Sequence, residues 1–233
     1  RQMCIRDRRE GIKMERIICL AIGYLFGMFQ TSYIIGKIHH MDIRQYGSGN
    51  AGTTNALRTL GKKAGAMTLI GDMLKCVIAI LIVDAVFKNR YQEILPLLGM
   101  YTAAGCVLGH NFPFYMGFKG GKGIAVMAGL VAANSFWSLP ESLLLIPVTL
   151  VCFLIPVVIT RYISVGSLAA YTVFLIEMIL AGRLGWFDMD AARIYELDII
   201  LFALTVLAWY RHRENIKRLM AGTENKFGAK KKE

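Results

Sequence analysis

The residues best suited to chemistry in this chain lie in one glycine-rich stretch, residues 117–123, which reads Gly-Phe-Lys-Gly-Gly-Lys-Gly. Glycines let a loop turn its backbone N–H groups toward one point, and the ammonium groups of Lys119 and Lys122 add positive charge there. Such a loop can hold an oxyanion such as a phosphate. It cannot lie in a bilayer core, because glycine weakens a helix and each lysine costs about 2.5–3.5 kcal/mol at the bilayer centre.

The same stretch is similar to the end of a nucleotide-binding P-loop but departs from that template at two positions. A P-loop has glycine where this chain has Met116, and serine or threonine where it has Gly123. We therefore do not expect ATP as a ligand, and we predict that Gly120 and Gly121 contact another phosphate compound. The alternative is that the two lysines are only positive anchors at a membrane surface.

A second glycine-rich loop, within residues 47–58, carries polar groups of a similar kind. It formally contains the G-x-G-x-x-G pattern of dinucleotide-binding proteins, but an apolar helix precedes it instead of a strand, so we reject that interpretation. If a helix starts near Thr53, an arginine one turn later can grip a phosphate with two hydrogen bonds. The alternative is an ordinary turn with a helix N-cap. The residues predicted to contact substrate in this loop are Ser48, Gly49, Asn50, Thr54, Asn55 and Arg58.

His110 stands a few residues before the lysine-bearing loop and is a candidate general base. It could equally orient a substrate or cap the end of the preceding helix, where a cation is favoured. Other polar residues are predicted to face the same site: Asn111, Ser164, Ser167, His212 and Asn215. The last two share a face if a helix begins there, because they are three residues apart.

Long apolar segments separate these motifs and predict an all-α, polytopic integral membrane protein. Hydrophobic residues make up 55% of the 233 residues and charged residues only 18%, which is below the roughly 25% of soluble domains. Some segments fall short of the roughly 20 residues that a full span needs, so we expect five to seven spans and take about seven. The expected helices cover residues 17–36, 64–87, 94–109, 124–138, 141–159, 165–182 and 197–210.

Small and charged residues inside the first two expected helices predict a close helix contact and an ion pair. Gly23, Gly27 and Gly36 permit close contact between helices. Asp72 and Lys75 are three residues apart and share a face, so they can form an ion pair. Charged residues at membrane depth are candidates for function.

Charge placement predicts the orientation in the membrane. The net charge is +11, and most of the excess lies in the loops after odd-numbered helices and in the C-terminal tail. The positive-inside rule places these loops and the C-terminus in the cytoplasm, so that seven spans leave the N-terminus outside. We expect no nucleic-acid partner, because the basic residues are interleaved with apolar spans.

The predicted organisation is one membrane domain, residues 14–218, followed by a basic cytoplasmic tail, residues 219–233. The basic segment 1–13 opposes the predicted orientation and has no apolar periodicity. We therefore interpret it as an extension ahead of a natural start at Met14; the alternative is an uncleaved N-terminal tail.

Three motifs together resemble the bacterial acyl-phosphate:glycerol-3-phosphate acyltransferases, the PlsY family. They lie within residues 47–58, 109–123 and 161–167, and residues 212–216 also match. The resemblance covers about residues 17–218, with a departure at 29–32, where family members often carry Ile-Pro. It implies transfer of a fatty acyl group from acyl phosphate to the 1-hydroxyl of glycerol 3-phosphate, which gives lysophosphatidic acid and inorganic phosphate. It also implies a monomer in the bacterial cytoplasmic membrane, in contact with membrane lipid, with no metal and no cofactor.

Within that reaction we expect Ser48, His110 and Asn215 to be catalytic and the other candidate residues to bind the substrates. Acyl phosphate is already activated, so positioning and charge stabilisation can suffice, and we expect no covalent acyl-enzyme. A phosphate oxygen of the donor would then take the hydroxyl proton. The competing hypothesis makes His110 the base. The alternative class, a transporter of a phosphorylated solute, would need polar groups near the bilayer midplane, where this chain has few.

Overall fold

The computed structural model describes the backbone of residues 2–134 and 142–228 and the side chains of residues 14–134 and 144–228. All regular structure in these residues is helical, as the sequence predicts. The long helices are α1 (Gln2–Gly27), α4 (Lys62–Tyr91), α5 (Leu95–Asn111), α6 (Ile124–Asn134), α7 (Ser142–Thr160), α8 (Ile163–Arg183) and α9 (Ala191–Arg211). The short helices are α2 (Thr31–Ile38), α3 (Thr53–Leu60) and α10 (Arg213–Met220), with single 3₁₀ turns at Ile43–Gln45, Gln92–Ile94 and Phe114–Met116.

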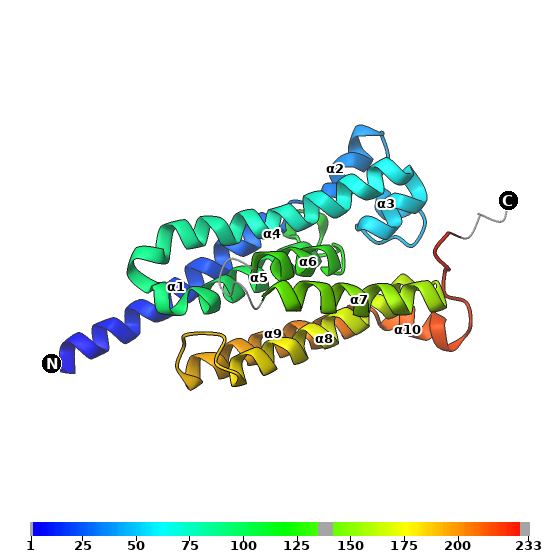
Figure 1. The fold of residues 1–233 in the computed structure, drawn as a ribbon. Helices are drawn as coiled ribbons and strands as arrows, with labels where there is room; N and C mark the ends of the chain where they lie inside the picture. Colours follow the sequence, from blue (N-terminus) through cyan, green and yellow to red (C-terminus); the bar gives the residue numbers. More distant parts are fainter. Residues whose placement is uncertain (1, 135–141, 229–233) are drawn as a thin grey trace.

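The long helices pack side by side into a bundle (Figure 1). The short helices α2, α3 and α10 gather at one end of this bundle, while α1 begins near the opposite end. Of the loops that carry the sequence motifs, the first joins α2 to α3, the second joins α5 to α6, and residues 161–162 join α7 to α8. The topology therefore brings the candidate residues to a single end of the molecule.

Glycine pairs on α1 and α5 let these two helices touch through their backbones. A Cβ atom built on Gly23 would lie 1.9 Å from the carbonyl oxygen of Thr102, and one on Gly109 would lie 2.2 Å from that of Tyr24. The expected close contact is confirmed for Gly23, as it is for Gly27, whose added Cβ would meet a carbonyl oxygen of α5 at 2.2 Å. Small residues allow this approach where lipid supplies no hydrophobic drive for association.

The expectation of one continuous helix over residues 17–36 is wrong. α1 ends at Gly27 and the chain unwinds for three residues before α2 begins. Side chains from elsewhere bind the freed carbonyl groups of this segment. The Tyr115 hydroxyl donates to the Met28 carbonyl at 2.7 Å, and Lys75 Nζ donates to the Phe29 carbonyl at 2.6 Å. An unwound membrane segment is tolerated when other side chains satisfy its freed backbone groups.

The predicted acidic loop over residues 183–196 is also shorter than expected, because α9 begins at Ala191 and not near 197. The Asp190 carboxylate accepts a hydrogen bond from the Arg193 backbone N–H at 2.9 Å, which caps the helix start. The other expected helices match within a few residues, except that 135–138 and 141 lie outside the described residues.

The outer surface of the bundle is apolar. Val158 on α7, with Ile199 and Phe202 on α9, are all more than half exposed. Exposed apolar faces of this extent suit contact with lipid. In the part of the chain that the structure describes, three helical stretches are long and apolar enough to cross a membrane, namely Met14–Ile38, Lys62–Met116 and Ile163–Arg183. The number of spans, the orientation of the termini and the domain boundaries stay predictions.

Candidate functional site

A cavity of about 570 Å³ opens at the end of the bundle where the motif-bearing loops meet. Its lining contains every predicted site residue except Asn111 and Gly121. The predicted residues that line it are Ser48, Gly49, Asn50, Thr54, Asn55, Arg58, His110, Lys119, Gly120, Lys122, Ser164, Ser167, His212 and Asn215. Polar groups that are scattered along the sequence therefore converge in space.

Asn55 folds the first loop. Its side-chain amide donates to the carbonyl oxygens of Ile43 and Tyr46, each at 3.0 Å, and its oxygen accepts from the Ser48 backbone N–H at 2.9 Å. Asn55 is 1% exposed, so these bonds occupy its side chain and hold the loop in shape. Asn55 therefore shapes the cavity wall, and its neighbours present their polar groups to the interior.

The condition set for Arg58, a helix that starts near Thr53, is met, because α3 begins at that residue. Gly52 precedes it and provides no side-chain cap, so the first N–H groups of α3 are left for another partner at the cavity wall. Arg58 lies one turn further along and also lines the cavity. Burial lowers the pKa of this guanidinium, and its Nη2 donates to the Asn225 carbonyl at 3.3 Å.

The lysine-bearing loop folds tightly back onto the end of α5. The Gly121 and Gly120 backbone N–H groups donate to the carbonyls of His110 and Asn111, at 3.0 and 3.1 Å. A Cβ on Gly120 would stand 2.0 Å from the His110 carbonyl oxygen, and one on Gly121 would stand 2.0 Å from His110 Nε2. Arg211 Nη2 holds the same turn from α9, at 3.0 and 2.8 Å from its two glycine carbonyls.

The two lysines of this loop lie in different environments. Lys119 is exposed at the cavity rim, whereas Lys122 reaches inside and donates to the Asn215 side-chain oxygen. Burial is the main cause that lowers the pKa of Lys122 to about 8, and repulsion from Arg218 adds to it. Lys122 is therefore the better placed of the two to bind an anion inside the cavity.

The C-terminal side of the cavity contains an acid that the sequence patterns did not identify. Glu224 is buried, and its carboxylate accepts from Asn215 Nδ2 and Arg218 Nε, both at 2.7 Å. The Ser164 hydroxyl lies 3.4 Å from the same carboxylate. Glu224 thus ties α10 to α8. Its position in a basic tail gave no sign of this role.

His212 turns one ring nitrogen away from the cavity. Its Nδ1 lies 2.8 Å from the Ala208 carbonyl oxygen, so Nδ1 carries the proton and Nε2 is left as an acceptor. Burial lowers the pKa of His212 to about 4, so the ring is neutral at physiological pH. A helix does follow at this point, since α10 spans Arg213–Met220 with His212 as its N-cap.

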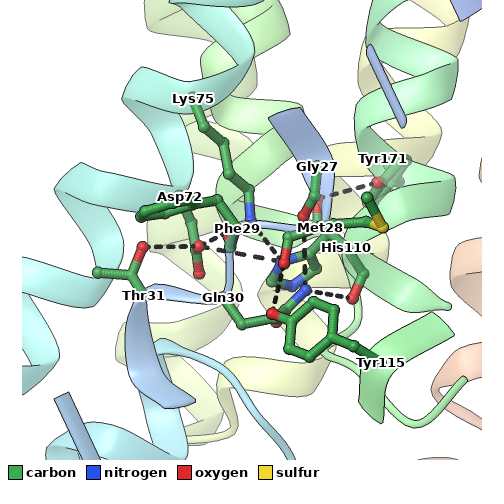
Figure 2. A network of polar contacts seen from close by, with 11 residues as sticks. Gly27, Met28, Phe29, Gln30, Thr31, Asp72, Lys75, His110, Tyr115 and Tyr171 are labelled. Carbon is green, nitrogen blue, oxygen red and sulfur yellow. Dashed lines mark hydrogen bonds and ion pairs between the residues drawn. The ribbon is translucent and has the colours of Figure 1, made fainter. Parts of the chain in front are cut away.

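A buried charged network (Figure 2) includes Asp72 and His110, which line the cavity, and Lys75 beside them. Lys75 Nζ is 2.9 Å from Asp72 Oδ1 and 2.9 Å from His110 Nδ1, and all three residues are at least 94% buried. The expected Asp72–Lys75 pair is confirmed. Sequence reasoning missed its third member, because His110 comes from a different helix.

Two predicted contact residues stand apart from the cavity. Asn111 is fully buried behind it, and neither polar atom of its side chain has a partner among the described residues. Gly121 supports the cavity through its packing against His110. Among the residues that the structure describes, no group of three or more His, Cys, Asp or Glu side chains is arranged to hold a metal ion.

Comparison with known proteins assigns the family. The model of the glycerol-3-phosphate acyltransferase family matches residues 17–222. A glycerol-3-phosphate acyltransferase of Clostridioides difficile is 44% identical, with 92% of this chain and 97% of that protein aligned. Its counterpart in Halalkalibacterium halodurans is 41% identical, over 94% of this chain and 98% of that protein.

Solved structures agree with the sequence matches. The crystal structure of PlsY (YgiH), an integral membrane glycerol 3-phosphate acyltransferase in its glycerol 3-phosphate form, superposes with a TM-score of 0.74 at 31% identity. The alignment covers 91% of this chain and 96% of that one. The lysophosphatidic acid form gives a TM-score of 0.72. The chain therefore belongs to the glycerol-3-phosphate acyltransferase family, and it is a membrane acyltransferase of the PlsY type.

Proposed function

We propose that the protein transfers a fatty acyl group from acyl phosphate to the sn-1 hydroxyl of glycerol 3-phosphate. The hydroxyl oxygen attacks the acyl carbonyl carbon, and the bond between that carbon and the phosphate oxygen breaks. The hydroxyl proton leaves with the phosphate, so the products are lysophosphatidic acid and inorganic phosphate. The names of the relatives support the acceptor, and the cations of the cavity support a second phosphate-bearing substrate.

The observation that carries this proposal is the concentration of positive charge in one cavity. Lys122 feels repulsion from Arg218, Arg211 and Arg58, so four cationic side chains lie close to one another. Such crowding is unfavourable in an empty site and becomes favourable when anions bind between the cations. Two phosphate groups provide that compensation.

The cavity also offers an apolar side for the acyl chain. Leu57 of α3, Leu69 of α4, Phe153 of α7 and Ile163 of α8 contribute to its lining. Hydrocarbon can lie against these side chains and continue between helices whose outer faces suit lipid, while the head groups stay among the cations. This division favours an enzyme that works at the membrane surface.

The proposal assigns roles by position. Arg58 and Lys122 neutralise phosphate, and the hydroxyl of Ser48 with nearby backbone N–H groups stabilises oxyanions. Asn215, which accepts from Lys122, orients that lysine. Because the leaving phosphate accepts the proton itself, the mechanism requires no covalent acyl-enzyme and no protein base.

The same proposal includes the setting of the enzyme. The protein acts as a monomer in the bacterial cytoplasmic membrane, with the cavity facing the cytoplasm, where phosphorylated substrates are made. The positive charge of the cavity loops supports this orientation through the positive-inside rule.

A donor panel with purified protein in nanodiscs tests the proposal. Radiolabelled glycerol 3-phosphate is offered with acyl phosphate, acyl-coenzyme A or acyl-carrier protein, and lysophosphatidic acid is quantified. We expect product from acyl phosphate alone; product from only one of the other donors would refute the donor assignment. A second arm incubates wild-type protein and Ser48→Ala with radiolabelled acyl phosphate without acceptor, and label retained by denatured protein of either kind would refute the absence of an acyl-enzyme.

A further inference from the structure

The ammonium group of Lys75 has used all its hydrogen-bonding capacity. It contacts Asp72 Oδ1 at 2.9 Å, the Phe29 carbonyl oxygen at 2.6 Å and His110 Nδ1 at 2.9 Å (Figure 2). An ammonium has three N–H donors and no acceptor. Each of its three neighbours must therefore supply a lone pair, and for the histidine that lone pair is on Nδ1.

This contact fixes where His110 carries its proton. If Nδ1 accepts from Lys75, the neutral ring carries its only hydrogen on Nε2. A doubly protonated ring is disfavoured, because it would direct a second N–H toward an ammonium 2.9 Å away. The neighbouring Asp72 carboxylate pairs with the ammonium group of Lys75 at 2.9 Å.

Further contacts hold this arrangement in place. The Thr31 hydroxyl donates to Asp72 Oδ1 at 3.1 Å. The backbone oxygen of His110 accepts from Gln30 Nε2 at 2.9 Å and from the Gly121 N–H at 3.0 Å. The ring is thus anchored by its side chain and by its backbone, so its free edge has a defined direction.

The Nε2 side of the His110 ring is its side toward the cavity. His110 lines the cavity, and within the described residues Nε2 has no hydrogen-bond partner. Gly121 lies against this nitrogen, and an added Cβ there would be 2.0 Å away. A ligand in the cavity can therefore receive the N–H.

We propose that Lys75, held by Asp72, is a positioning residue that fixes His110 as an Nε2–H donor to an oxyanion of the bound substrates. His110 is then not the base that takes the hydroxyl proton. The identity of the oxyanion rests on the proposed acyl transfer, whereas the position of the proton on the ring does not. His212 is in the opposite state, because its Nδ1 donates to a carbonyl and its Nε2 is an acceptor.

Nitrogen NMR tests the state of the ring directly. The full protein is labelled with ¹⁵N-histidine, and the signals are assigned by comparison with His110→Gln and His212→Gln. We expect His110 to be protonated on Nε2 only, and we expect Lys75→Met to place a proton on Nδ1, facing Asp72 at 3.9 Å. Protonation of wild-type His110 on Nδ1, or an unchanged spectrum in Lys75→Met, would overturn the proposal.

Lys75 also donates to the carbonyl of Phe29 in the unwound segment between α1 and α2. A matched control is therefore needed to separate its effect on the His110 ring from its support of that segment. Tyr115→Phe removes the other cap, the hydrogen bond to the Met28 carbonyl, without touching His110. We expect it to leave the histidine spectrum unchanged and kcat within about threefold of wild type. A histidine spectrum altered as much by Tyr115→Phe as by Lys75→Met would assign Lys75 a structural role only.

Activity provides a second readout. A glutamine amide can place an N–H near the position of Nε2, whereas the shorter asparagine places its amide near Nδ1. We expect His110→Gln to keep kcat within about tenfold of wild type, and His110→Asn to lose about a hundredfold, since an error of about 1 Å in a catalytic contact can cost that much. Equal loss in both variants would overturn the donor role. If the NMR result holds but no acyl transfer is found, the proposed function fails and the positioning by Lys75 stands.

Discussion

Replacement of Gly121 by alanine should damage the site through collisions with the His110 ring and with the Ala51 backbone. The new Cβ would stand 2.0 Å from His110 Nε2 and 2.7 Å from the Ala51 carbonyl oxygen. Separations below 3.0 Å do not persist, so the ring or the loop must move by about 1.4 Å to restore an ordinary contact of 3.4 Å. The Ala51 atom belongs to backbone and the His110 atoms to a side chain, so we expect the ring to move further than the backbone.

The size of the effect follows from what the ring loses. A shift of that length breaks the 2.9 Å contact with Lys75 Nζ. A hydrogen bond to a charged group is worth about 1.5–3 kcal/mol. At about 1.4 kcal/mol for each factor of ten, kcat/KM should fall about 10- to 100-fold.

Gly117 offers a matched control in the same loop. Its φ is +64° and an added Cβ would meet nothing within 4 Å. Gly117→Ala therefore costs about 1–2 kcal/mol of backbone strain but leaves His110 in place, and kcat/KM should stay within about threefold of wild type. Steady-state kinetics and melting temperatures are measured for both variants. Wild-type activity in Gly121→Ala, or equal impairment in both variants, would refute the reasoning.

Three other substitutions test separate parts of the account. Lys122 is charged below its pKa of about 8 and neutral above it, so KM for glycerol 3-phosphate should rise as the pH increases through 8. The Lys122→Arg variant should not show that rise. A wild-type KM that stays constant from about pH 7 to 9 would contradict an anion contact. Arg58→Lys keeps the charge but loses the two-pronged donor, so KM should increase about tenfold, and an unaltered KM would remove Arg58 from the binding site. Gly109→Leu would drive a side chain into the Tyr24 backbone, 2.2 Å from its Cβ, and should lower the melting temperature by several degrees; a normal melting temperature would contradict the backbone contact of α1 with α5.

The sequence predicted the helices because apolar length is a local property of the chain. It failed at residues 28–30, because the groups that cap the broken helix are Lys75 and Tyr115, which lie far away in sequence. The start of α9 was misplaced for a different reason. A run of acids suggested a loop, although Asp190 forms the N-cap.

The site residues were predictable where residue type alone implies chemistry. Glycines next to Lys122, and polar residues before Arg58, indicated an anion site without a structure. Glu224 could not be found that way, because an acid among basic residues looks like an exposed tail, yet it is buried against Asn215. The ion pair of α4 was visible from spacing, but its contact with His110 depends on how α4 packs against α5.

The most direct test of the central claim follows one oxygen atom. Purified protein in nanodiscs is given acyl phosphate and glycerol 3-phosphate that carries ¹⁸O in its sn-1 hydroxyl, and the products are analysed by ³¹P NMR and mass spectrometry. We predict lysophosphatidic acid and inorganic phosphate in equal amounts, with all the label in the new ester and none in the phosphate. Free fatty acid with a doubly phosphorylated glycerol, or no consumption of acyl phosphate, would contradict acyl transfer between two bound phosphates.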